Sequence, residues 1–190
     1  MKNRLTIAIQ KGGRLSDQSK DLIKKSGINF STKGDKLLAK SNNLPIDILF
    51  VRDDDIPSLV SNGDADLAIV GENVLIEKTL FKKNNTVKVL DLGFSKCRLS
   101  IAAPDNKKNM RLANKKIATS YPNILKKYLA DNNINATVTN IHGSVELTPY
   151  IGMSDCICDL VSSGATLEAN NLKEIKVILN SQAVLIKNKK

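Results

Sequence analysis

Short apolar segments alternate with amphipathic ones along the whole chain. Runs of Ile, Leu, Val and Ala bounded by polar residues are typical of buried strands. We expect strands at 5–10, 46–51, 66–71, 87–93, 97–104, 115–120, 136–141, 156–161, 174–180 and 182–188. Helices are expected between them, over 16–26, 55–62, 71–78, 121–133 and 143–152 and after Ser163. This alternation predicts an α/β fold with mostly parallel sheets flanked by helices.

Two helix starts carry residues that favour capping. Ser16 is predicted to cap the first helix, which Gly27 ends, and Asp54 to cap the second, which ends at Gly63. The pattern restarts near 93–97, which predicts two lobes. We assign residues 1–94 and 172–190 to the first lobe and 95–171 to the second.

Charge and hydropathy restrict the kinds of molecule that the protein is expected to bind. The chain of 190 residues has a net charge of +10, yet its lysines are scattered and 4% of its residues are aromatic, so no base-stacking surface is predicted. A solvated basic surface that helps to attract a small polyanion is favoured over nucleic-acid binding. No apolar run reaches membrane-spanning length, and the N-terminus lacks the apolar core of a signal peptide. These features predict a cytoplasmic protein with no membrane partner.

The residues that usually hold transition metals or perform nucleophilic catalysis are few. The cysteines, Cys97, Cys156 and Cys158, lie in apolar runs and are expected to be buried, reduced thiols. The single histidine, His142, has no partner at the spacing of a catalytic triad or a metal site, so a structural role or a place at the rim of the site is expected for it.

Four polar loops follow predicted strands, at the sheet edge where such folds bind ligands. The strongest candidate is Ser162-Ser163-Gly164-Ala165-Thr166, because small residues let backbone N–H groups approach an anion, hydroxyls donate, and a helix start follows. Asp159 just before it suits the hydroxyls of a sugar. A phosphate beside a ribose is one reading of this loop, and a plain strand-to-helix connection is the other.

The remaining loops are less specific. Lys11-Gly12-Gly13-Arg14 places two cations around two glycines, which suits a polyphosphate. Arg52 precedes Asp53, Asp54 and Asp55; these acids suit either helix capping, which we favour, or Mg²⁺ held through water. The last of the four loops follows the third expected strand and contains Glu72.

The segment 146–167, ELTPYIGMSDCICDLVSSGATL, resembles the signature of the ATP phosphoribosyltransferases. The segments AIQKGGRLSDQS, PIDILFVRDDDIP, GDADLAIVGENVL, GFSKCRLSIAAP and ATSYPNILKKYL are similar to that family in the same order. The resemblance implies two periplasmic-binding-protein-like lobes with the active site in the cleft between them. It implies a transferase of the first step of histidine biosynthesis, which joins ATP and phosphoribosyl pyrophosphate (PRPP) into N1-(5-phosphoribosyl)-ATP and releases diphosphate, with Mg²⁺ as cofactor.

The resemblance also implies roles for residues of this sequence. Arg14, Arg52 and Asp159 are the catalytic candidates, and no metal ligand is assigned. The substrate-binding candidates are Lys11, Gly12, Gly13, Glu72, Ser162, Ser163, Gly164, Ala165 and Thr166. The chemistry agrees with this set, because N1 of adenine carries no proton and needs no general base, whereas the departing diphosphate needs cations.

The C-terminal end of the sequence, at Lys190, leaves two alternatives within the family. Long-form members continue into a histidine-binding domain, which we do not expect here, whereas short-form members work with a regulatory subunit similar to histidyl-tRNA synthetase. KGGRLSDQS and VRDDDIP are more similar to long-form sequences, so the chain is either a truncated long form or a short natural protein. Family members are dimers or larger oligomers.

Two other classes of function compete with the transferase. A two-lobed protein that binds a small anion without chemistry would have the same fold. A basic nucleic-acid-binding protein would show steep salt dependence and loose ligand choice.

Overall fold

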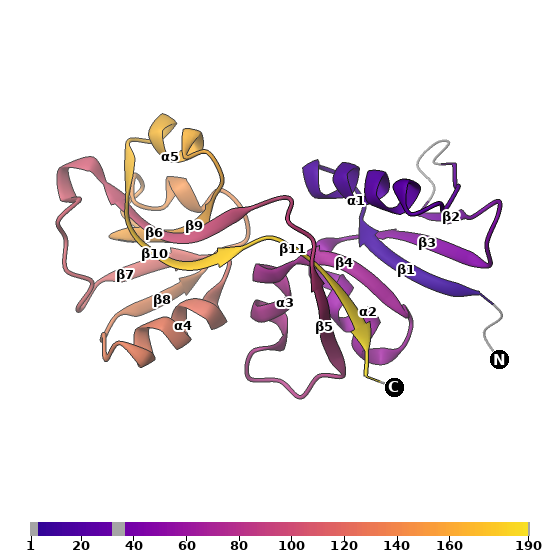
Figure 1. Ribbon diagram of the computed structural model, residues 1–190. Coiled ribbons are helices and arrows are strands. Elements are labelled where there is room, and N and C mark those ends of the chain that lie inside the picture. Colours follow the sequence, from indigo (N-terminus) through magenta and orange to yellow (C-terminus); the bar gives the residue numbers. More distant parts are fainter. Residues whose placement is uncertain (1–3, 32–36, 190) are drawn as a thin grey trace. The chain divides into compact units, whose positions relative to one another are not determined.

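The computed structural model describes residues 4–31 and 37–189, which fold into two compact units. One unit comprises the described residues up to Ser95 together with those from Gln182 onward; the other is Lys96–Ser181 (Figure 1). Residues 1–3, 32–36 and 190, which the predicted first lobe includes, lie outside the described residues. No helix in the described part of the chain is long and apolar enough to cross a membrane.

The first unit contains a six-stranded sheet in the order β2-β3-β1-β4-β11-β5. Its strands are β1 (Leu5–Gln10), β2 (Leu38–Lys40), β3 (Ile46–Val51), β4 (Leu67–Gly71), β5 (Thr86–Asp91) and β11 (Ala183–Asn188). β1 pairs in parallel with β3 and β4, while β2, β11 and β5 are antiparallel to their neighbours. The parallel part therefore lies at the centre, and its carboxyl ends bring the first three candidate loops to one edge.

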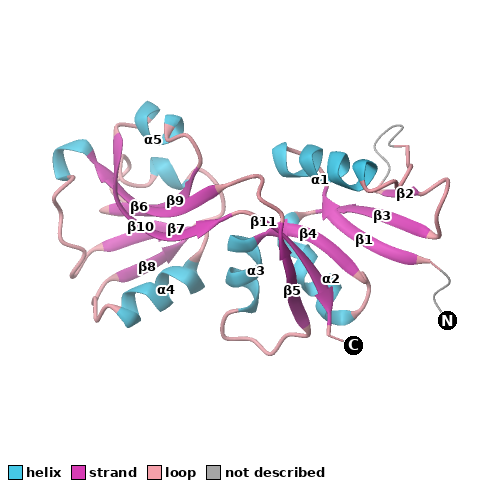
Figure 2. Ribbon diagram, in the orientation of Figure 1, coloured by secondary structure: helices cyan, strands magenta, loops and turns pink. Residues whose placement is uncertain are grey.

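Helices cover both faces of this sheet, as the alternating side chains of β1 require. Ile7 and Ile9 pack with Ile23 of α1 (Arg14–Lys25) on one face. Ala8 packs on the other face with residues of α2 (Ile56–Asn62) and α3 (Glu72–Thr79), which Figure 2 shows opposite α1. Full burial of each aliphatic side chain contributes about 1.5–3 kcal/mol. The core thus fixes the helix starts at the carboxyl edge of the parallel strands.

The second unit contains a five-stranded mixed sheet in the order β10-β6-β9-β7-β8. Its elements are β6 (Cys97–Pro104), β7 (Lys116–Thr119), α4 (Pro122–Asp131), β8 (Thr137–Asn140), β9 (Cys156–Val161), α5 (Ala165–Ala169) and β10 (Leu172–Ser181), with 3₁₀ turns at η2 (Asp105–Lys107) and η3 (Val145–Leu147). β9, β7 and β8 are parallel, and β6 is antiparallel to both β9 and β10. Ala102, Ile157 and Val161 form one face, where Val145 of η3 and Leu167 of α5 cover them.

Several local expectations need correction. Residues 172–181 form β10 and pair with β6, so they lie in the second unit and not with the first, as the sequence assignment had it. Both sheets are mixed, so the parallel arrangement expected holds only for β3, β1 and β4 of the first sheet and for β9, β7 and β8 of the second. The segment 143–152 forms only the 3₁₀ turn η3 and no α-helix. β2 was not predicted, since three residues carry too little periodicity.

The predicted caps were also wrong. α1 begins at Arg14 with Gly13 as its N-cap, and Ser16 is a buried residue of its first turn. α2 follows the 3₁₀ turn η1 (Asp53–Asp55), so Asp54 caps nothing; its carboxylate lies 3.2 Å from Nζ of Lys78. The predicted stop at Gly63 is confirmed by its left-handed conformation, φ 85°.

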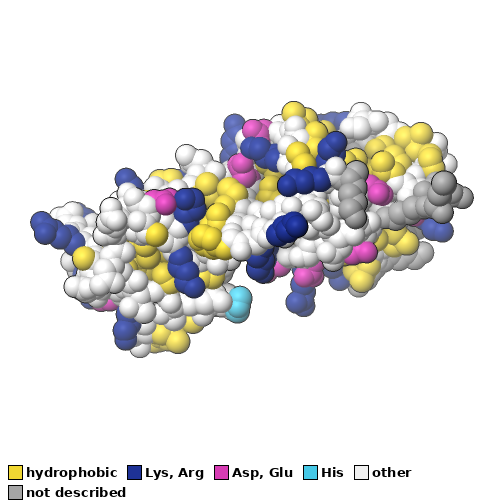
Figure 3. All heavy atoms as spheres, turned by 90° about the horizontal axis from the view of Figure 1, so that it is seen from below, with side chains coloured by type: hydrophobic (Ala, Val, Ile, Leu, Met, Phe, Trp, Pro, Cys, Tyr) yellow, Lys and Arg dark blue, Asp and Glu magenta, His cyan; other side chains and the backbone are white. Residues whose placement is uncertain are grey.

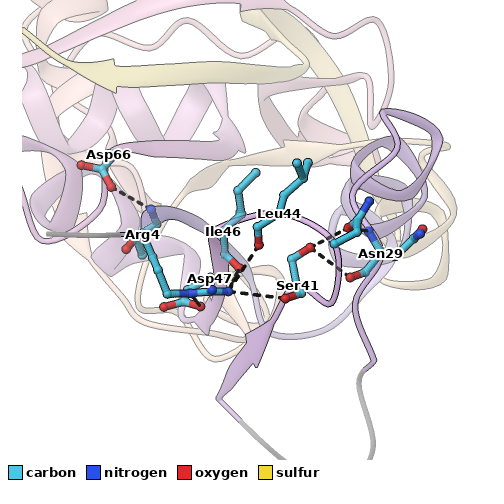
Figure 4. A network of polar contacts seen from close by, with 9 residues as sticks. Arg4, Asn29, Ser41, Leu44, Ile46, Asp47 and Asp66 are labelled. Carbon is cyan, nitrogen blue, oxygen red and sulfur yellow. Dashed lines mark hydrogen bonds and ion pairs between the residues drawn. The ribbon is translucent and has the colours of Figure 1, made fainter.

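One basic residue has a structural role at the amino ends of β1 and β3 (Figure 4). Arg4 Nε donates to Asp47 Oδ1 at 2.7 Å, and Nη2 donates to the carbonyl of Ile46 at 2.8 Å. Beside it, the N–H of Thr6 donates to Asp66 Oδ2 at 2.7 Å. These contacts stabilise the end of the sheet opposite the candidate loops. Arg4 therefore has a structural role that requires no ligand.

Candidate functional site

The loop of residues 11–14 lies beside Arg52 at the carboxyl ends of β1 and β3. The two strands are in register to their last residues, and the N–H of Lys11 donates to the carbonyl of Val51 at 2.8 Å. Lys11, Arg14 and Arg52 are all exposed. The structure therefore brings three of the predicted cations to one basic edge of the first unit.

The two glycines of this loop have different reasons to be glycine. Gly13 has φ 86° and ψ 177°, a conformation nearly restricted to glycine, at the start of α1. Gly12 has ordinary backbone, and no heavy atom lies within 4 Å of the place where its Cβ would stand. The backbone around Gly12 is thus open to a close approach.

The acidic run after Arg52 makes local contacts. Asp53 Oδ1 accepts the N–H of Asp54 at 3.0 Å, and Asp54 pairs with Lys78 at 3.2 Å. Among residues 4–31 and 37–189, no cluster of three or more His, Cys, Asp or Glu could hold a metal ion. Neither contact is the helix cap that we favoured for these acids, because Asp53 bonds only to the next residue and Asp54 pairs with a lysine.

Glu72 begins α3 at the carboxyl end of β4, in the predicted position. Its Oε1 lies 2.8 Å from Nζ of Lys88, which also contacts Asp91 Oδ1 at 3.0 Å. Hydrogen bonds to Glu72 and then Asp91 raise the pKa of Lys88. A ligand that uses Glu72 must compete with this lysine, which makes it the least available of the candidates.

In the second unit, a pocket of about 150 Å³ follows β9. Its lining is Glu146, Asp159, Leu160, Val161, Ser162, Ser163, Gly164, Ala165, Thr166 and Leu167. The structure thus brings all six residues predicted from this segment to one pocket. Gly164 has φ 93° and lets the chain turn into α5, while the Ser163 and Thr166 side chains are exposed. Small exposed residues around a tight turn suit an oxygen-rich anion.

Asp159 is the half-buried acid of this pocket. Its Oδ1 accepts the N–H of the next residue, Leu160, at 2.8 Å. Desolvation raises the pKa of the carboxyl group, the Leu160 N–H lowers it, and the charge of Glu146 raises it again. The net shift is upward, so the folded protein holds this charge at a cost, as binding and catalytic groups often do.

Glu146 was missed as a site residue. It belongs to η3, thirteen positions before Asp159, yet it lines the same pocket and its charge acts on the Asp159 carboxyl. It is the first residue of the quoted family signature, which is the signal that pointed to it. The pocket therefore holds two carboxylates beside the hydroxyl-rich turn.

Ser100 on β6 stands directly opposite Asp159 in the antiparallel β6–β9 ladder. Its side chain is buried, and its Oγ has no hydrogen-bond partner among the described residues. Opposed residues of such a ladder share a face, which places a spare hydroxyl beneath the pocket. Nothing in the sequence pattern indicated this pairing, because it depends on strand register.

The remaining reactive residues are the histidine and the three cysteines, of which Cys97 is half-buried and not buried as expected. His142 is exposed, and the histidine is visible at the surface in Figure 3. All three cysteines are free thiols; Cys156 and Cys158 are buried, and burial raises the pKa of Cys156 to about 12. Lys and Arg side chains are scattered over the face drawn in Figure 3 without a single continuous patch, as a solvated basic surface requires.

Comparison of the sequence with known proteins gives a consistent result. The profile of the HisG family, described as ATP phosphoribosyltransferase, matches residues 52–190. An ATP phosphoribosyltransferase of Cytophaga hutchinsonii is 53% identical over 187 residues, which cover 95% of this chain and 63% of that protein. The chain therefore spans less than two thirds of the length of this curated relative.

Solved structures agree with the sequence match. A chain of the ATP phosphoribosyl transferase (HisG:HisZ) complex from Thermotoga maritima superposes with a TM-score of 0.83 at 29% identity, covering 97% of this chain and 88% of that one. The alkanesulfonate-binding protein SsuA from Xanthomonas axonopodis pv. citri reaches 0.56 at 14% identity, covering 98% and 66%. The second likeness shows the fold alone, which is periplasmic-binding-protein-like. Since the profile matches well over half of the sequence, the chain belongs to the HisG family of ATP phosphoribosyltransferases.

Proposed function

We propose that the protein transfers the 5-phosphoribosyl group of PRPP to N1 of ATP and releases diphosphate, the first step of histidine biosynthesis. The observation that carries this proposal is the pocket in which Asp159 and Glu146 lie beside the turn of residues 162–166, in a chain of this family. The pocket offers acceptors for hydroxyls and donors for a phosphate side by side, the two features of a phosphorylated ribose.

We assign the 5-phosphate to the turn and the ribose hydroxyls to the acids. The backbone N–H groups and the Ser163 and Thr166 hydroxyls are the donors for the phosphate oxygens. Ionised Asp159 and Glu146 accept hydrogen bonds from the two hydroxyls of the ribose. Each charge-assisted hydrogen bond contributes about 1.5–3 kcal/mol, so the pair orients the sugar and its C1.

The basic edge of the first unit is assigned to the phosphates of ATP and to the diphosphate. Arg14 and Arg52 present planar forks for phosphate oxygens, and Lys11 presents a point charge. In the reaction, N1 attacks C1 with its lone pair while the C1–O bond to diphosphate breaks. Negative charge then grows on the leaving oxygen, so cations that contact the diphosphate lower the barrier more than they strengthen ground-state binding.

No side chain is required to move a proton in this step. N1 of neutral adenine carries none, and the positive charge that forms there is delocalised over the ring. His142, the one histidine, is exposed, and no triad is needed. The residues contribute orientation and charge, which is consistent with a chain poor in general bases.

Mg²⁺ belongs to the proposal as the companion of the diphosphate. Mg²⁺ commonly uses one or two carboxylates, waters and substrate phosphates rather than an all-protein cage. The described residues fit that mode, because they form no metal cluster of their own while Asp159 and Glu146 share a pocket. When bound, the ion would neutralise charge on the leaving group.

Assembly is proposed on the same basis. The structure from Thermotoga maritima is a complex of HisG with HisZ. We propose that this chain forms a dimer or larger homo-oligomer and works with a regulatory subunit similar to histidyl-tRNA synthetase. Copurification of that subunit and the mass of the assembly by light scattering test both statements.

A direct assay tests the reaction. The purified protein is mixed with ATP, PRPP and Mg²⁺, with and without a candidate regulatory subunit, and the ultraviolet absorbance of the adduct is followed. Growth of the adduct signal in step with diphosphate release supports the transferase. Saturable binding of PRPP with no adduct under either condition would instead support an anion-binding protein without chemistry.

A further inference from the structure

The pocket proposed for the phosphate has an unbalanced charge. Its lining contains Glu146 and Asp159 and no Lys or Arg among the residues that the structure describes. α5, which follows the turn, has only five residues, so its dipole is a weak source of positive potential. A phosphate with two negative charges beside two carboxylates needs a nearby cation.

Arg98 of β6 is the cation with a described bond to the turn. It stands opposite Val161 in the β6–β9 ladder, one residue before the turn begins. Its Nη1 donates to the carbonyl of Ser162 at 3.2 Å. Its Nε lies 2.7 Å from Glu174 Oε2 on β10, and the two side chains are one-third and about one-quarter exposed.

This geometry gives Arg98 two effects on the turn. The guanidinium is a planar fork, so the bond to Glu174 fixes the plane in which Nη1 meets the Ser162 carbonyl. By holding that carbonyl, Arg98 keeps it turned toward the guanidinium and fixes the backbone from which the turn continues. Its charge is a second and smaller effect, because Glu174 balances part of it. A lysine supplies the charge without the fork.

We propose that Arg98 is a positioning residue for the phosphate, which orders the turn of residues 162–166 through its bond to the Ser162 carbonyl, beside a pocket whose described lining has no Lys or Arg. Glu174 orients the arginine. This inference rests on the proposed function of the turn. It adds a residue from a strand that carries none of the assigned substrate contacts.

Ribose 5-phosphate is the probe that isolates this site, because it contains the phosphate and the sugar hydroxyls but no diphosphate. Its affinity is measured by calorimetry for the wild type, Arg98→Gln, Arg98→Lys and Glu174→Gln. We expect Arg98→Gln to weaken binding about tenfold, the loss of about 1.4 kcal/mol, with Arg98→Lys and Glu174→Gln between it and the wild type. Steady-state kinetics should show the KM for PRPP rising with a nearly constant KM for ATP.

Lys127→Gln is the matched control. It removes the same charge and also breaks an exposed ion pair, the i,i+4 pair with Asp131 on α4. We expect its affinity for ribose 5-phosphate to stay within about twofold of the wild type, since exposed pairs contribute little. If Lys127→Gln and Arg98→Gln weakened ribose 5-phosphate binding equally, the loss would be due to net charge alone, and the proposed role of Arg98 would be wrong.

Other outcomes separate the inference from the proposed function. If the wild type binds ribose 5-phosphate and Arg98→Gln binds it equally well, the inference is wrong and the proposed function stands. If Arg98→Gln loses ATP and ribose 5-phosphate binding together with a lower melting temperature, the residue is merely structural and the inference is again wrong. A wild type that binds neither ribose 5-phosphate nor PRPP would overturn both.

Discussion

The basic edge of the first unit and the pocket after β9 in the second, where we propose that the phosphate binds, differ in construction. Lys11, Arg14 and Arg52 are exposed side chains on loops that follow central parallel strands. The pocket has half-buried carboxylates, small hydroxyl residues and a left-handed glycine, and Arg98 of the neighbouring strand β6 donates to the carbonyl of Ser162. The first region is defined by exposed positive charge, and the second by the backbone conformation of a turn.

The difference has an energetic consequence. Exposed cations cost the fold almost nothing, so they can be removed with little loss of stability. Asp159 is held in a place where desolvation and Glu146 disfavour its charge, so it destabilises the folded state at neutral pH. Substitution of the exposed cations should therefore lower activity and leave stability unchanged. Substitution of Asp159 should lower activity and raise stability at neutral pH.

The largest effect is expected for Asp159→Ala. It removes one of the two proposed acceptors for the ribose hydroxyls, and turnover at low PRPP should fall by up to about a hundredfold, since a charge-assisted hydrogen bond is lost. The kcat/KM for PRPP measures this loss, and circular dichroism checks the fold. Normal kcat/KM in a folded variant would show that Asp159 is not part of the site.

Gly164→Ala should have the next largest effect. The left-handed backbone at φ 93° disfavours a side chain by about 1–2 kcal/mol, so the turn should distort and lose about tenfold in affinity for PRPP. Gly12→Ala is the control for stability, because its backbone is ordinary and the space for a Cβ is open. If both variants melted alike and Gly164→Ala kept its affinity, the shape of the turn would not matter.

Arg52→Ala sharpens the comparison from the other side. Removal of an exposed cation should raise the KM for ATP or lower kcat by about tenfold, as loss of one charge-assisted contact does, with little change in melting temperature. Kinetics at several ATP concentrations and differential scanning fluorimetry measure the two quantities. A large drop in melting temperature with unchanged kinetics per folded molecule would assign Arg52 to the fold.

The smallest effect is a pH dependence of stability. Because the pKa of Asp159 is raised in the folded protein, the folded state binds the proton more tightly than the unfolded state. Its unfavourable contribution is fully present above the folded pKa and disappears below the ordinary aspartate pKa. Asp159→Asn should thus be more stable than the wild type at pH 7, with the difference shrinking as pH falls. Urea unfolding of both proteins across that range measures it; a difference that grows on acidification would contradict the raised pKa.

Local pattern predicted the strands and the loops at their carboxyl ends, because apolar runs and small polar residues are contiguous in sequence. The local pattern could not predict which distant segments pair with one another. The placement of β10 beside β6, the position of Glu146 in the Asp159 pocket and the bond from Arg98 to Ser162 all depend on strand order and register. The prediction that Ser16 caps the first helix was wrong, because Gly13 adopts a backbone conformation that starts the helix at Arg14.

One measurement tests the division between the two regions most directly: calorimetric binding of ribose 5-phosphate and of PRPP to Asp159→Asn and Arg52→Ala. Ribose 5-phosphate should bind Arg52→Ala as it binds the wild type and should lose most of its affinity for Asp159→Asn, whereas PRPP should be weakened by both substitutions. Loss of ribose 5-phosphate binding in Arg52→Ala with normal binding in Asp159→Asn would contradict the assignment of the sugar phosphate to the pocket after β9.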